Sequence, residues 1–372
     1  MSNSLHIISF NVPYPPDYGG VIDVYYKIKA LHAAGVKIHL HTFIYGRKES
    51  SELESLCESV KYYKRKPMWQ GIFTNKPMIV DSRRSSALLQ NLLKDNYPIL
   101  FEGLHACYYL NDSKLSKRFK MVRMHNNEAE YYFSLAKREK SFISSIYYYE
   151  EFKRLKLFEK KLKSADYLLA IAHHEKEYYK NIFNNTLYVG PFHGNTIVTA
   201  KSGKGKYVLY HGNLSVSENQ EAAMYLIEQV FNDMDLQLII AGLQPGEVLK
   251  KSISKIENIS LVDSPQESEL QELIANAHVN ILPSFQKTGV KLKLINSLFN
   301  GRFCLTNQLM VDETGLEKYC IIANTPHEMK TALYDVMEKE FTDEDLEFRK
   351  LIEAEYSNKT GAEIIIQLMQ QN

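Results

Sequence analysis

Several short polar stretches in this chain hold residue types that bind anions or move protons. In residues 14–20, two adjacent glycines precede a helical pattern that begins at Val21. Adjacent glycines let the backbone approach a ligand closely and leave N–H groups that can donate to it. The stretch would serve equally well as an ordinary turn between a strand and a helix, and it lacks the GxGxxG spacing of dinucleotide sites. Both interpretations therefore stay open.

A denser polar cluster follows a strand expected at residues 120–124. It contains Arg123, His125, Asn126 and Glu128. A histidine at the carboxyl edge of a parallel sheet can donate a hydrogen bond or act as a general base near neutral pH. The alternative is a histidine satisfied by the local backbone. The surrounding polar residues favour the functional interpretation.

Two stretches in the second half of the chain could hold phosphate. Residues 210–214 are expected to form a strand-to-helix turn around Gly212. This turn could bind a phosphate, and it could equally well be an ordinary turn without a ligand. Residues 287–293 place a glycine, a threonine and three lysines at the start of a helix expected at 292–300. Backbone amides, the helix dipole and lysine charge all favour a diphosphate there. Because lysines oppose the dipole at a helix N-terminus, helix stability does not explain their presence.

Basic and aromatic residues alternate in residues 61–69, which include the only tryptophan. This composition suits an anionic lipid surface, where aromatic rings lie at the headgroups and cations are attracted. Residues 147–161, with three adjacent tyrosines and several lysines, could extend that surface. An exposed strand with solvated charges is the alternative. Single-stranded nucleic acid would also accept this composition, but no recognition-motif spacing supports it.

Short apolar strands alternate with helical patterns along the whole chain. In the first half, strands are expected at residues 5–10, 36–43, 98–102, 120–124, 167–172 and 186–189, with helices at 21–34 and 150–163. In the second half, strands are expected at 207–210, 236–241, 259–262, 279–282, 302–305 and 320–323, with helices at 219–231, 270–277, 292–300, 327–338 and from 344 onward. Helices between strands are the crossovers that parallel sheets require. The expected class is α/β, with two Rossmann-like βαβ domains facing across a cleft.

A glycine-rich stretch at residues 190–206 separates the two series and is the expected linker. It divides the chain into an N-terminal domain at 1–195, a C-terminal domain at 196–345 and a C-terminal helix at 346–372 that is expected to pack back on the first domain. Ligands of open parallel sheets bind outside the carboxyl ends of the strands. A nucleotide in the cleft is therefore the expectation.

Length and charge agree with two folded domains. At 372 residues, with 45% hydrophobic and 24% charged residues, the chain has the composition of a folded soluble protein. Its net charge of +1 argues against a dedicated nucleic-acid binder. That total hides a division, because residues 1–195 carry 29 basic and 19 acidic side chains and residues 196–372 carry 16 and 25. The basic first half is expected to face an anionic membrane surface or another polyanion.

The four cysteines lie far apart and show no CxxC spacing, so neither a zinc site nor a disulfide framework is expected. Free thiols indicate a reducing cytosol. The N-terminus lacks the basic region and the long apolar stretch of a signal peptide, and no apolar run of about 18 residues occurs. We therefore expect a cytoplasmic protein that associates with a membrane only at its surface.

Taken in order, these motifs resemble the GT-B-fold glycosyltransferases of the retaining, glycogen-synthase-like superfamily, the group 1 or family four type. Each motif is short, and the specificity of the resemblance lies in their order and spacing from the first strand to Gly301. The motifs are residues 13–20, Arg123-x-His125-Asn126-x-Glu128, Gly212-Asn213-Leu214 with Asn219, Ala241-Gly242, Pro283-Ser284 and Gly289-x-Lys291-x-Lys293-Leu294.

The resemblance implies a nucleotide-diphosphate sugar as co-substrate, held mainly by the second domain, and a glycan or lipid-linked acceptor held mainly by the first. It implies transfer with retention of anomeric configuration, in polysaccharide or glycoconjugate biosynthesis, without a metal or another cofactor. His125 and Lys293 are the implied catalytic residues, which orient the sugar and stabilise the leaving diphosphate. The implied donor-binding residues are Gly19, Gly20, Gly212, Asn213, Gly242, Thr288, Gly289, Val290, Lys291 and Asn296. The implied acceptor-side residues are Tyr14, Asp17, Tyr18, Glu102, Arg123, Asn126 and Glu128.

The chain departs from the superfamily pattern at the donor site. The superfamily commonly has two glutamates with seven residues between them, where this chain has Thr288 and Asn296. It often has arginine and lysine at the turn after the first strand of the second domain, where this chain has Asn213 and Glu218. The lysines of the later helix could replace the missing phosphate charge. The alternatives are an active glycosyltransferase, a catalytically degenerate GT-B-like protein that binds nucleotide or glycan or partners an active transferase, and a GT-B-fold nucleotide-sugar epimerase.

Overall fold

The chain folds into two compact units in a computed structural model that describes residues 3–67, 74–139, 141–285 and 292–371. Within these residues, unit 1 contains the chain up to Gly194 and again from Tyr356, and unit 2 runs from Asn195 to Glu355. The change from unit 1 to unit 2 therefore falls inside the stretch at 190–206 that the sequence marks as a linker.

The segment at 346–355 corrects one expected boundary. It was expected to belong with the C-terminal helix, but it is part of unit 2. The guanidinium of Arg349 is buried there and donates to the carbonyl of Leu298 at 2.8 Å, and Ile352 is fully buried. A buried arginine needs several acceptors, and the end of a neighbouring helix provides them.

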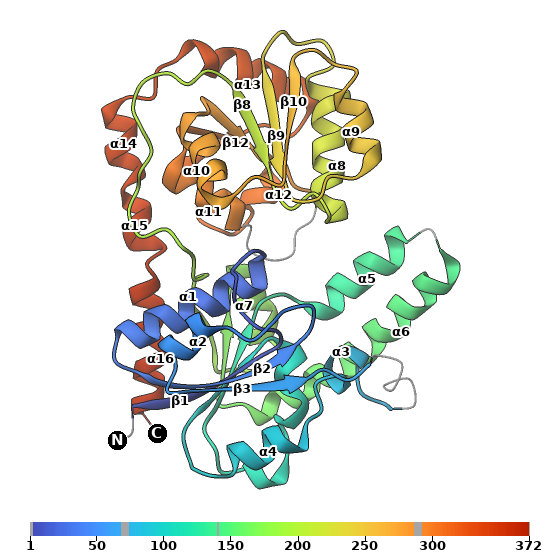
Figure 1. The fold of residues 1–372 in the computed structure, drawn as a ribbon, viewed down its shortest axis with the longest axis vertical. Helices are drawn as coiled ribbons and strands as arrows, with labels where there is room; N and C mark the ends of the chain where they lie inside the picture. The colour runs from blue at the N-terminus through green and yellow to red at the C-terminus, as the bar shows by residue number, and fades with distance from the viewer. Residues whose placement is uncertain (1–2, 68–73, 140, 286–291, 372) are drawn as a thin grey trace. The chain divides into compact units, whose positions relative to one another are not determined.

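Unit 1 is built on a sheet of seven parallel strands in the order β3-β2-β1-β4-β5-β6-β7 (Figure 1). The strands are β1 (Ser4–Ser9), β2 (Lys37–Ile44), β3 (Ser59–Lys64), β4 (Ile99–Glu102), β5 (Lys120–Met124), β6 (Tyr167–Ala170) and β7 (Thr186–Tyr188). Every residue of β1, β4 and β5 is buried. Central parallel strands are covered on both faces, which is why their sequences read as nearly continuous apolar runs.

Helices cover both faces of this sheet. One face packs against α1 (Gly19–Ala33), α2 (Ser51–Leu56) and α16 (Asn358–Gln370). The other packs against α3 (Met78–Asp81), α4 (Ser86–Leu92), the end of α6 (Phe142–Glu159) and α7 (His173–Lys180). Short 3-10 turns complete the unit at η2 (Leu104–Tyr109), η3 (Ser113–Leu115) and η4 (Lys160–Ser164).

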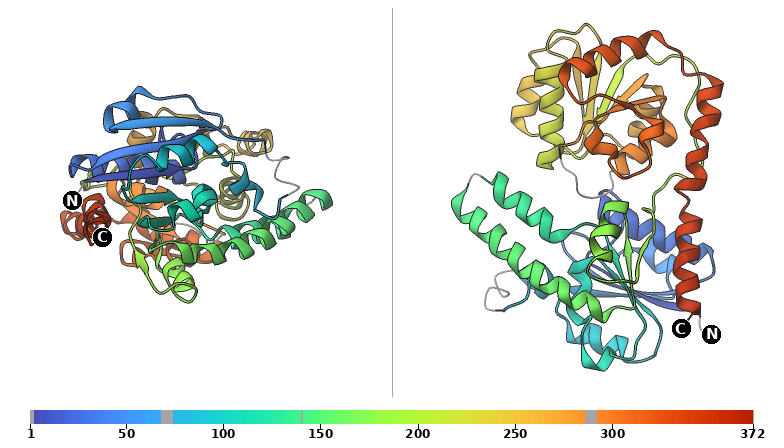
Figure 2. Two further views of the ribbon diagram at one scale, coloured as in Figure 1. Left: turned by 90° about the horizontal axis from the view of Figure 1, so that it is seen from below. Right: turned by 180° about the vertical axis from the view of Figure 1, so that it is seen from behind.

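A helical hairpin projects from the rest of unit 1 (Figure 1 and Figure 2). Its two arms are α5 (Glu128–Arg138) and α6, which pack against each other along their length. The rings of Phe133 and Phe152 lie 5.0 Å apart between the arms, and the Ser145 hydroxyl donates to the Ala136 carbonyl at 2.8 Å. The hairpin is therefore held by its own contacts.

Unit 2 is a sheet of six parallel strands in the order β10-β9-β8-β11-β12-β13. The strands are β8 (Val208–His211), β9 (Leu238–Gly242), β10 (Ile259–Asp263), β11 (Val279–Ile281), β12 (Phe303–Thr306) and β13 (Ile321–Ile322). The helices are α8 (Ser217–Tyr225) with a π turn η5 (Leu226–Val230), α9 (Glu247–Ile253), α10 (Glu267–Asn276), α11 (Leu292–Asn300), α12 (Gln308–Val311), α13 (Pro326–Glu338), α14 (Asp343–Arg349) and α15 (Leu351–Glu355), with a 3-10 turn η6 (Glu317–Tyr319). Both sheets follow the strand–helix alternation expected of Rossmann-like domains, so the predicted α/β class is confirmed.

The largest local difference from expectation lies in the hairpin. The sequence pattern predicts a helix at 150–163, but α6 begins at Phe142, and α5 was not predicted. α6 exposes apolar side chains as well as charges, so it lacks the clean apolar stripe by which a buried helix is recognised. The π turn at the end of α8 likewise continues a helix that the pattern predicts to be regular.

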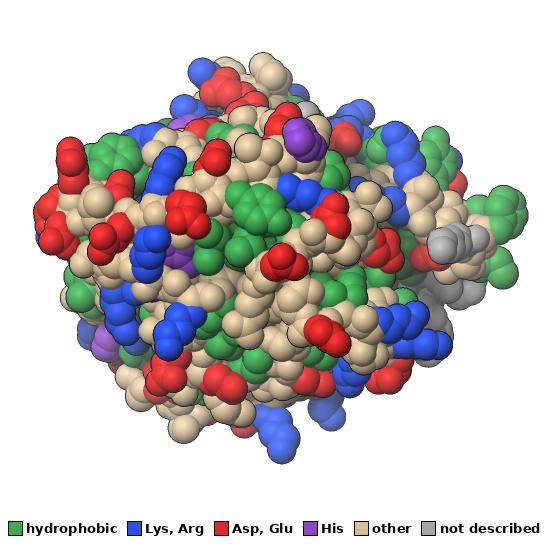
Figure 3. All heavy atoms as spheres, turned by 90° about the horizontal axis from the view of Figure 1, so that it is seen from above, with side chains coloured by type: hydrophobic (Ala, Val, Ile, Leu, Met, Phe, Trp, Pro, Cys, Tyr) green, Lys and Arg blue, Asp and Glu red, His purple; other side chains and the backbone are tan. Residues whose placement is uncertain are grey.

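Charges of both signs share the surface drawn in Figure 3. Acidic and basic side chains lie interspersed there, with hydrophobic side chains between them. Among the described helices, none is both long and apolar enough to cross a bilayer.

A chain of buried polar side chains links β1, β2 and β3 of unit 1. His41 Nε2 lies 2.9 Å from His6 Nδ1, and its Nδ1 lies 2.8 Å from the Tyr63 hydroxyl. His6 Nε2 in turn lies 2.9 Å from Asp95 Oδ1. Burial lowers the pKa of His41 to about 3, and the neighbouring His6 acts in the same direction. This part of the core therefore depends on a neutral His41.

We predict that acid weakens unit 1 through His41. Its folded pKa lies below the ordinary value of 6.5, so its neutral form contributes fully above that pH and progressively less as the pH falls toward 3. Relative to a His41→Gln variant, which does not titrate, the wild-type free energy of unfolding should fall by roughly 2–3 kcal/mol between pH 7 and pH 4. Urea titrations at each pH measure this difference. A difference independent of pH would contradict the prediction.

Candidate functional site

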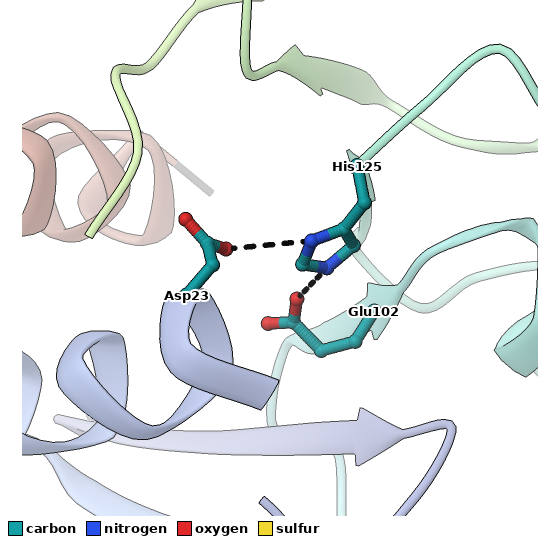
Figure 4. Close-up of side chains that lie close together, drawn as sticks. All are labelled: Asp23, Glu102 and His125. Atoms are coloured by element: carbon teal, nitrogen blue, oxygen red, sulfur yellow. Dashed lines mark hydrogen bonds and ion pairs between the residues drawn. The ribbon is translucent and has the colours of Figure 1, made fainter. Parts of the chain in front are cut away.

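His125 lies between two buried carboxylates (Figure 4). It directly follows β5, while Glu102 ends β4 and Asp23 lies near the start of α1. Its Nε2 atom is 2.8 Å from Glu102 Oε2, and its Nδ1 atom is 3.7 Å from Asp23 Oδ2. The histidine side chain is 11% exposed and both carboxylates are fully buried. Three distant stretches of sequence thus hold one slightly exposed imidazole.

Two buried cations neutralise these carboxylates. The Lys27 ammonium is 2.9 Å from Asp23 Oδ2 and 2.8 Å from each oxygen of Glu102. Arg123 donates to both oxygens of Asp23, at 2.8 and 3.2 Å, and its remaining donors reach backbone carbonyls just after β7. Buried charges persist only when they are paired and hydrogen-bonded, as all four are here. We call Asp23, Lys27, Glu102 and Arg123 the buried ion cluster.

The buried ion cluster keeps both carboxyl groups ionised. Burial by itself would raise the pKa of Asp23, but the charges of Arg123 and Lys27 hold it well below its ordinary range. Burial also opposes ionisation of Glu102, whose pKa is nevertheless lowered by Lys27 and by the hydrogen bond with His125. An ionised Glu102 is a strong acceptor that fixes the orientation of the imidazole.

The residues around His125 do not fit a metal centre. Asp23, Glu102 and His125 have ligand atoms within 4.8 Å of one another, a spacing that could hold a metal ion. However, Lys27 already contacts both carboxylates, and Arg123 contacts both oxygens of Asp23. A divalent ion would have to displace buried cations that hold the same oxygens. The arrangement is better suited to orienting an imidazole.

Phe10 forms one wall beside His125 and explains one of the predicted glycines. Its ring lies 5.6 Å from the imidazole, edge to face. A Cβ on Gly20 would lie 2.7 Å from that ring, so any other residue there would require the Phe10 ring to move. Gly103, with φ +71, faces His125 from another side. Gly19 has no atom within 4 Å of its Cβ position, which leaves its backbone open to a ligand.

The loop before α1 keeps three predicted acceptor-side residues at the surface. Tyr14 and Tyr18 are each 37% exposed. Asp17 forms an ion pair with Arg47, whose guanidinium lies 5.1 Å from the centre of the Tyr18 ring. Arg47 comes from the loop after β2, and sequence reasoning missed it because a single arginine there belongs to no motif.

Two other predicted acceptor-side residues need a corrected role. Glu102 and Arg123 are fully buried at adjacent positions of β4 and β5. They are therefore placed to hold His125 and Asp23 rather than to contact an acceptor. Asn126 is half-buried, and Glu128 begins α5 with 7% of its surface exposed. Burial raises the pKa of Glu128 to about 7, although the charge of Arg83 opposes the shift.

In unit 2, the start of α11 meets the turn after β8. The Lys293 ammonium donates to Asn219 Oδ1 at 2.9 Å and lies 5.1 Å from the centre of the Tyr210 ring. The Asn219 amide nitrogen donates to the carbonyl of Asn213 at 2.9 Å. Asn219 thus joins the predicted lysine to the predicted turn.

Gly212 and Gly242 lie against each other at the ends of β8 and β9. A Cβ on Gly242 would lie 1.9 Å from the Gly212 carbonyl oxygen, so no other residue fits without moving the backbone. A Cβ on Gly212 would lie 3.1 Å from the Asn219 side chain. The Asn213 side chain accepts two hydrogen bonds from Ser215, at 2.6 and 3.0 Å, and therefore shapes the turn.

Thr288 and Asn296 stand where the superfamily commonly has two glutamates, and of these two residues the structure describes Asn296. Its side-chain oxygen accepts from Gln271 at 3.2 Å and from Asn300 at 2.8 Å. This oxygen of a predicted donor-binding residue therefore already has two partners within unit 2. The predicted donor-binding residues Thr288, Gly289, Val290 and Lys291 lie outside the described residues.

Asp23 and Lys27 are two further site residues that the sequence did not reveal. They are four residues apart and lie next to the apolar positions of α1, so both belong to its buried face. A charged pair at this spacing on the buried side of a helix is a detectable signal. The pair points to a site only when the third charged residue, Glu102, is known to contact it. Glu102 is 75 residues away from Lys27 in the sequence, so the sequence does not reveal that contact.

We predict that Lys27→Met strongly destabilises the protein, since it leaves Asp23 and Glu102 buried with too little positive charge. The free energy of unfolding should fall by about 3–5 kcal/mol. Lys29→Met is the matched control, because Lys29 is exposed on the same helix and should change stability by less than about 0.5 kcal/mol. Urea denaturation of the full chain measures both. Equal effects of the two substitutions would show that the buried ion cluster is not structurally important.

Known proteins resemble unit 2 and most of the chain. The family model described as Glycosyl transferases group 1 matches residues 205–339, most of unit 2. An uncharacterized 44.6 kDa protein in the cps region of Klebsiella pneumoniae is 29% identical over 343 residues, which cover 86% of this chain and 87% of that protein.

Solved structures resemble the whole chain. The Anabaena protein HepE in complex with UDP matches 100% of both chains, with a TM-score of 0.69 and 11% identity. A mutant of TarM from S. aureus, in complex with Fondaparinux, alpha-GlcNAc-glycerol and UDP, matches 99% of this chain and 100% of its own, with a TM-score of 0.67 and 10% identity. At these identities the likeness concerns the fold. This likeness confirms the expected GT-B fold, and residues 205–339 are similar to the Glycosyl transferases group 1 family.

Proposed function

We propose that this chain is a glycosyltransferase that moves a sugar from a nucleotide-diphosphate sugar to a glycan or lipid-linked acceptor, with retention of anomeric configuration. The family match over residues 205–339 carries the proposal. That range contains the tightly packed Gly212 and Gly242 and the Lys293–Asn219 hydrogen bond. Unit 1 adds a histidine that two carboxylates and two cations hold in place.

A uridine-diphosphate sugar is the donor class with most support. HepE was solved with UDP and with UDP-glucose, and TarM with UDP. In this chain, the backbone N–H groups of the turn after β8 and the ammonium of Lys293 would bind the diphosphate. Because Glu218 stands where the superfamily often has a cation, Lys293 would carry a large share of this charge recognition.

The chemistry would be largely electrostatic. The bond between the anomeric carbon and the diphosphate oxygen breaks, and the leaving oxygen takes the electron pair. An acceptor hydroxyl oxygen bonds to the same carbon from the same face, and its proton passes to the leaving diphosphate. Lys293 would stabilise the resulting negative charge. His125, with one nitrogen held by Glu102, would orient the transferred sugar. Lys27 and Arg123 already neutralise the nearby carboxylates, which supports a reaction without a metal ion.

The biological setting would be surface polysaccharide synthesis in the cytoplasm. The support is the relative encoded in a cps region of Klebsiella pneumoniae. The described chain also has four free cysteines, which suit a reducing compartment. A lipid-linked acceptor would bring the protein to a membrane surface.

The hairpin of α5 and α6 would provide that membrane contact. Phe142 and Ile143, at the start of α6, are 79% and 81% exposed, and Ile146 and Tyr149 follow them as exposed apolar residues. Exposed lysines and arginines lie on the same two helices, including Lys153. Apolar side chains at a projecting tip with cations behind them are suited to an anionic bilayer. The stretch at 61–69 lies partly outside the described residues.

A catalytically degenerate GT-B-like protein is the second candidate. The observation that favours it is Asn296, which stands in place of a glutamate and whose side-chain oxygen already accepts two hydrogen bonds. Such a protein would bind a nucleotide or a glycan, or partner an active transferase, without turnover.

Donor binding and turnover distinguish these candidates. We predict that UDP at millimolar concentration raises the melting temperature of the full chain, since a ligand selective for the native state stabilises it. Lys293→Ala should lose most of this shift, whereas Lys250→Ala, on an exposed helix of the same unit, should keep it. No shift with UDP-, GDP-, ADP- or CMP-linked ligands would contradict donor binding.

Turnover is tested by slow hydrolysis of the bound nucleotide sugar. We predict that His125→Gln lowers the rate by roughly 10²–10³-fold while UDP binding is kept, because the side chain acts on the sugar. Binding without turnover in the wild type, toward water or any offered acceptor, would favour the degenerate protein.

Membrane contact is tested with vesicles. We predict that Phe142→Ser/Ile143→Ser lowers binding to phosphatidylglycerol-containing vesicles at least tenfold, and that salt weakens wild-type binding. Val248→Ser is the control, because Val248 is 75% exposed in unit 2. Equal binding of the wild type to neutral and anionic vesicles would contradict this role.

A further inference from the structure

Four cations from separate segments of unit 1 line a pair of adjoining hollows. They are Lys66 after β3, Lys76 before α3, Arg84 after α3 and Lys161 in η4. The two hollows have volumes of about 400 and 520 Å³ and share Lys76, Arg84, Lys161 and Tyr108. No residue of the buried ion cluster, and neither His125 nor Phe10, lines them. This is therefore a second location in unit 1.

The cations of this basic pocket have little counter-charge nearby. Within the described part of the chain, Lys66, Lys76 and Lys161 form no ion pair within 4 Å, and Arg84 reaches only Asp81, at 3.9 Å. The Nε atom of Arg84 is buried and has no hydrogen-bond partner among the described residues. An unsatisfied buried donor is costly unless a ligand completes it.

The lysines also face one another. The Lys76 ammonium lies 3.5 Å from the centre of the Tyr108 ring, and its charge, after burial itself, lowers the pKa of Lys161. Like charges held together on a half-buried surface repel, and an anion between them would remove this cost. Asp81 and Asp112 are the acids of the lining, so four cations face two carboxylates.

The two hollows differ in polarity. Beyond the residues that they share, one hollow adds the apolar side chains of Leu157 and Phe158, and the other adds Lys66, Ser86 and Asn111. Hydroxyl, amide and ammonium groups are donors for phosphate oxygens, while Leu157 and Phe158 offer only apolar surface. A ligand with a phosphate and an attached apolar group would match both halves.

We propose that this basic pocket of unit 1 binds a phosphate ester or diphosphate at a site separate from the donor and His125 sites. The phosphate lies among Lys66, Lys76, Arg84 and Lys161, and any apolar group attached to it lies against Leu157 and Phe158. A lipid headgroup and a soluble phosphate share this chemistry. The site goes beyond the proposed transfer reaction and does not depend on it.

Titration calorimetry of the full chain tests the site with two probes, inorganic pyrophosphate and water-soluble dihexanoyl phosphatidic acid. Lys76→Gln/Lys161→Gln should weaken binding of the preferred probe at least tenfold. Lys29→Gln/Lys37→Gln removes the same charge from exposed positions of unit 1 and should change binding less than twofold. An unchanged melting temperature shows that the double variant is folded.

The results distinguish a lipid headgroup from a soluble phosphate as the ligand, and they distinguish this pocket from the proposed donor site. Tighter binding of phosphatidic acid assigns the pocket to a lipid headgroup, and tighter binding of pyrophosphate assigns it to a soluble phosphate. Lys293→Ala should keep the pocket's binding, so failure of the donor site leaves this result intact. If Lys76→Gln/Lys161→Gln binds both probes as the wild type does, or if the two control lysines matter equally, the proposal is wrong.

Discussion

The buried ion cluster is the constraint on which the rest of unit 1 depends. Asp23, Lys27, Glu102 and Arg123 join α1 to the two central strands β4 and β5, and Asp23 also accepts from the backbone N–H of Phe192. Each charge is stable only while its partners stay in place, because an unpaired buried charge costs several kcal/mol. The helix, both strands and the segment after β7 therefore share one geometry.

That shared geometry connects structure to the proposed chemistry. Glu102 fixes one nitrogen of His125, and the tight contact of Gly20 with Phe10 places the start of α1 beside the same imidazole. Unit 2 positions its predicted donor-binding residues differently. Gly242 packs against the Gly212 carbonyl, and Asn219 accepts a hydrogen bond from Lys293. One unit positions its group with buried charge, and the other with close backbone packing.

Much of the fold was predictable because parallel strands have a simple sequence pattern. The central strands are buried on both faces, and β5 and α11 were predicted at their observed bounds. The hairpin was not predictable in the same way. Its exposed residues Phe142 and Ile143 break the amphipathic pattern, so the first turns of α6 carry no clear periodic signal.

The candidate site, like the fold, was predictable from the sequence only in part. The sequence by itself determined which residue types stand at the carboxyl ends of the strands and at the starts of the helices, and so named His125, Gly20, Gly212, Gly242 and Lys293. Only the tertiary structure decided that Glu102 and Arg123 are buried supports, that Asp23 and Lys27 complete them, and that four basic side chains meet in a separate pocket. The physical reason is that a motif records neighbours along the chain, whereas burial and charge pairing depend on residues that meet only when the chain folds.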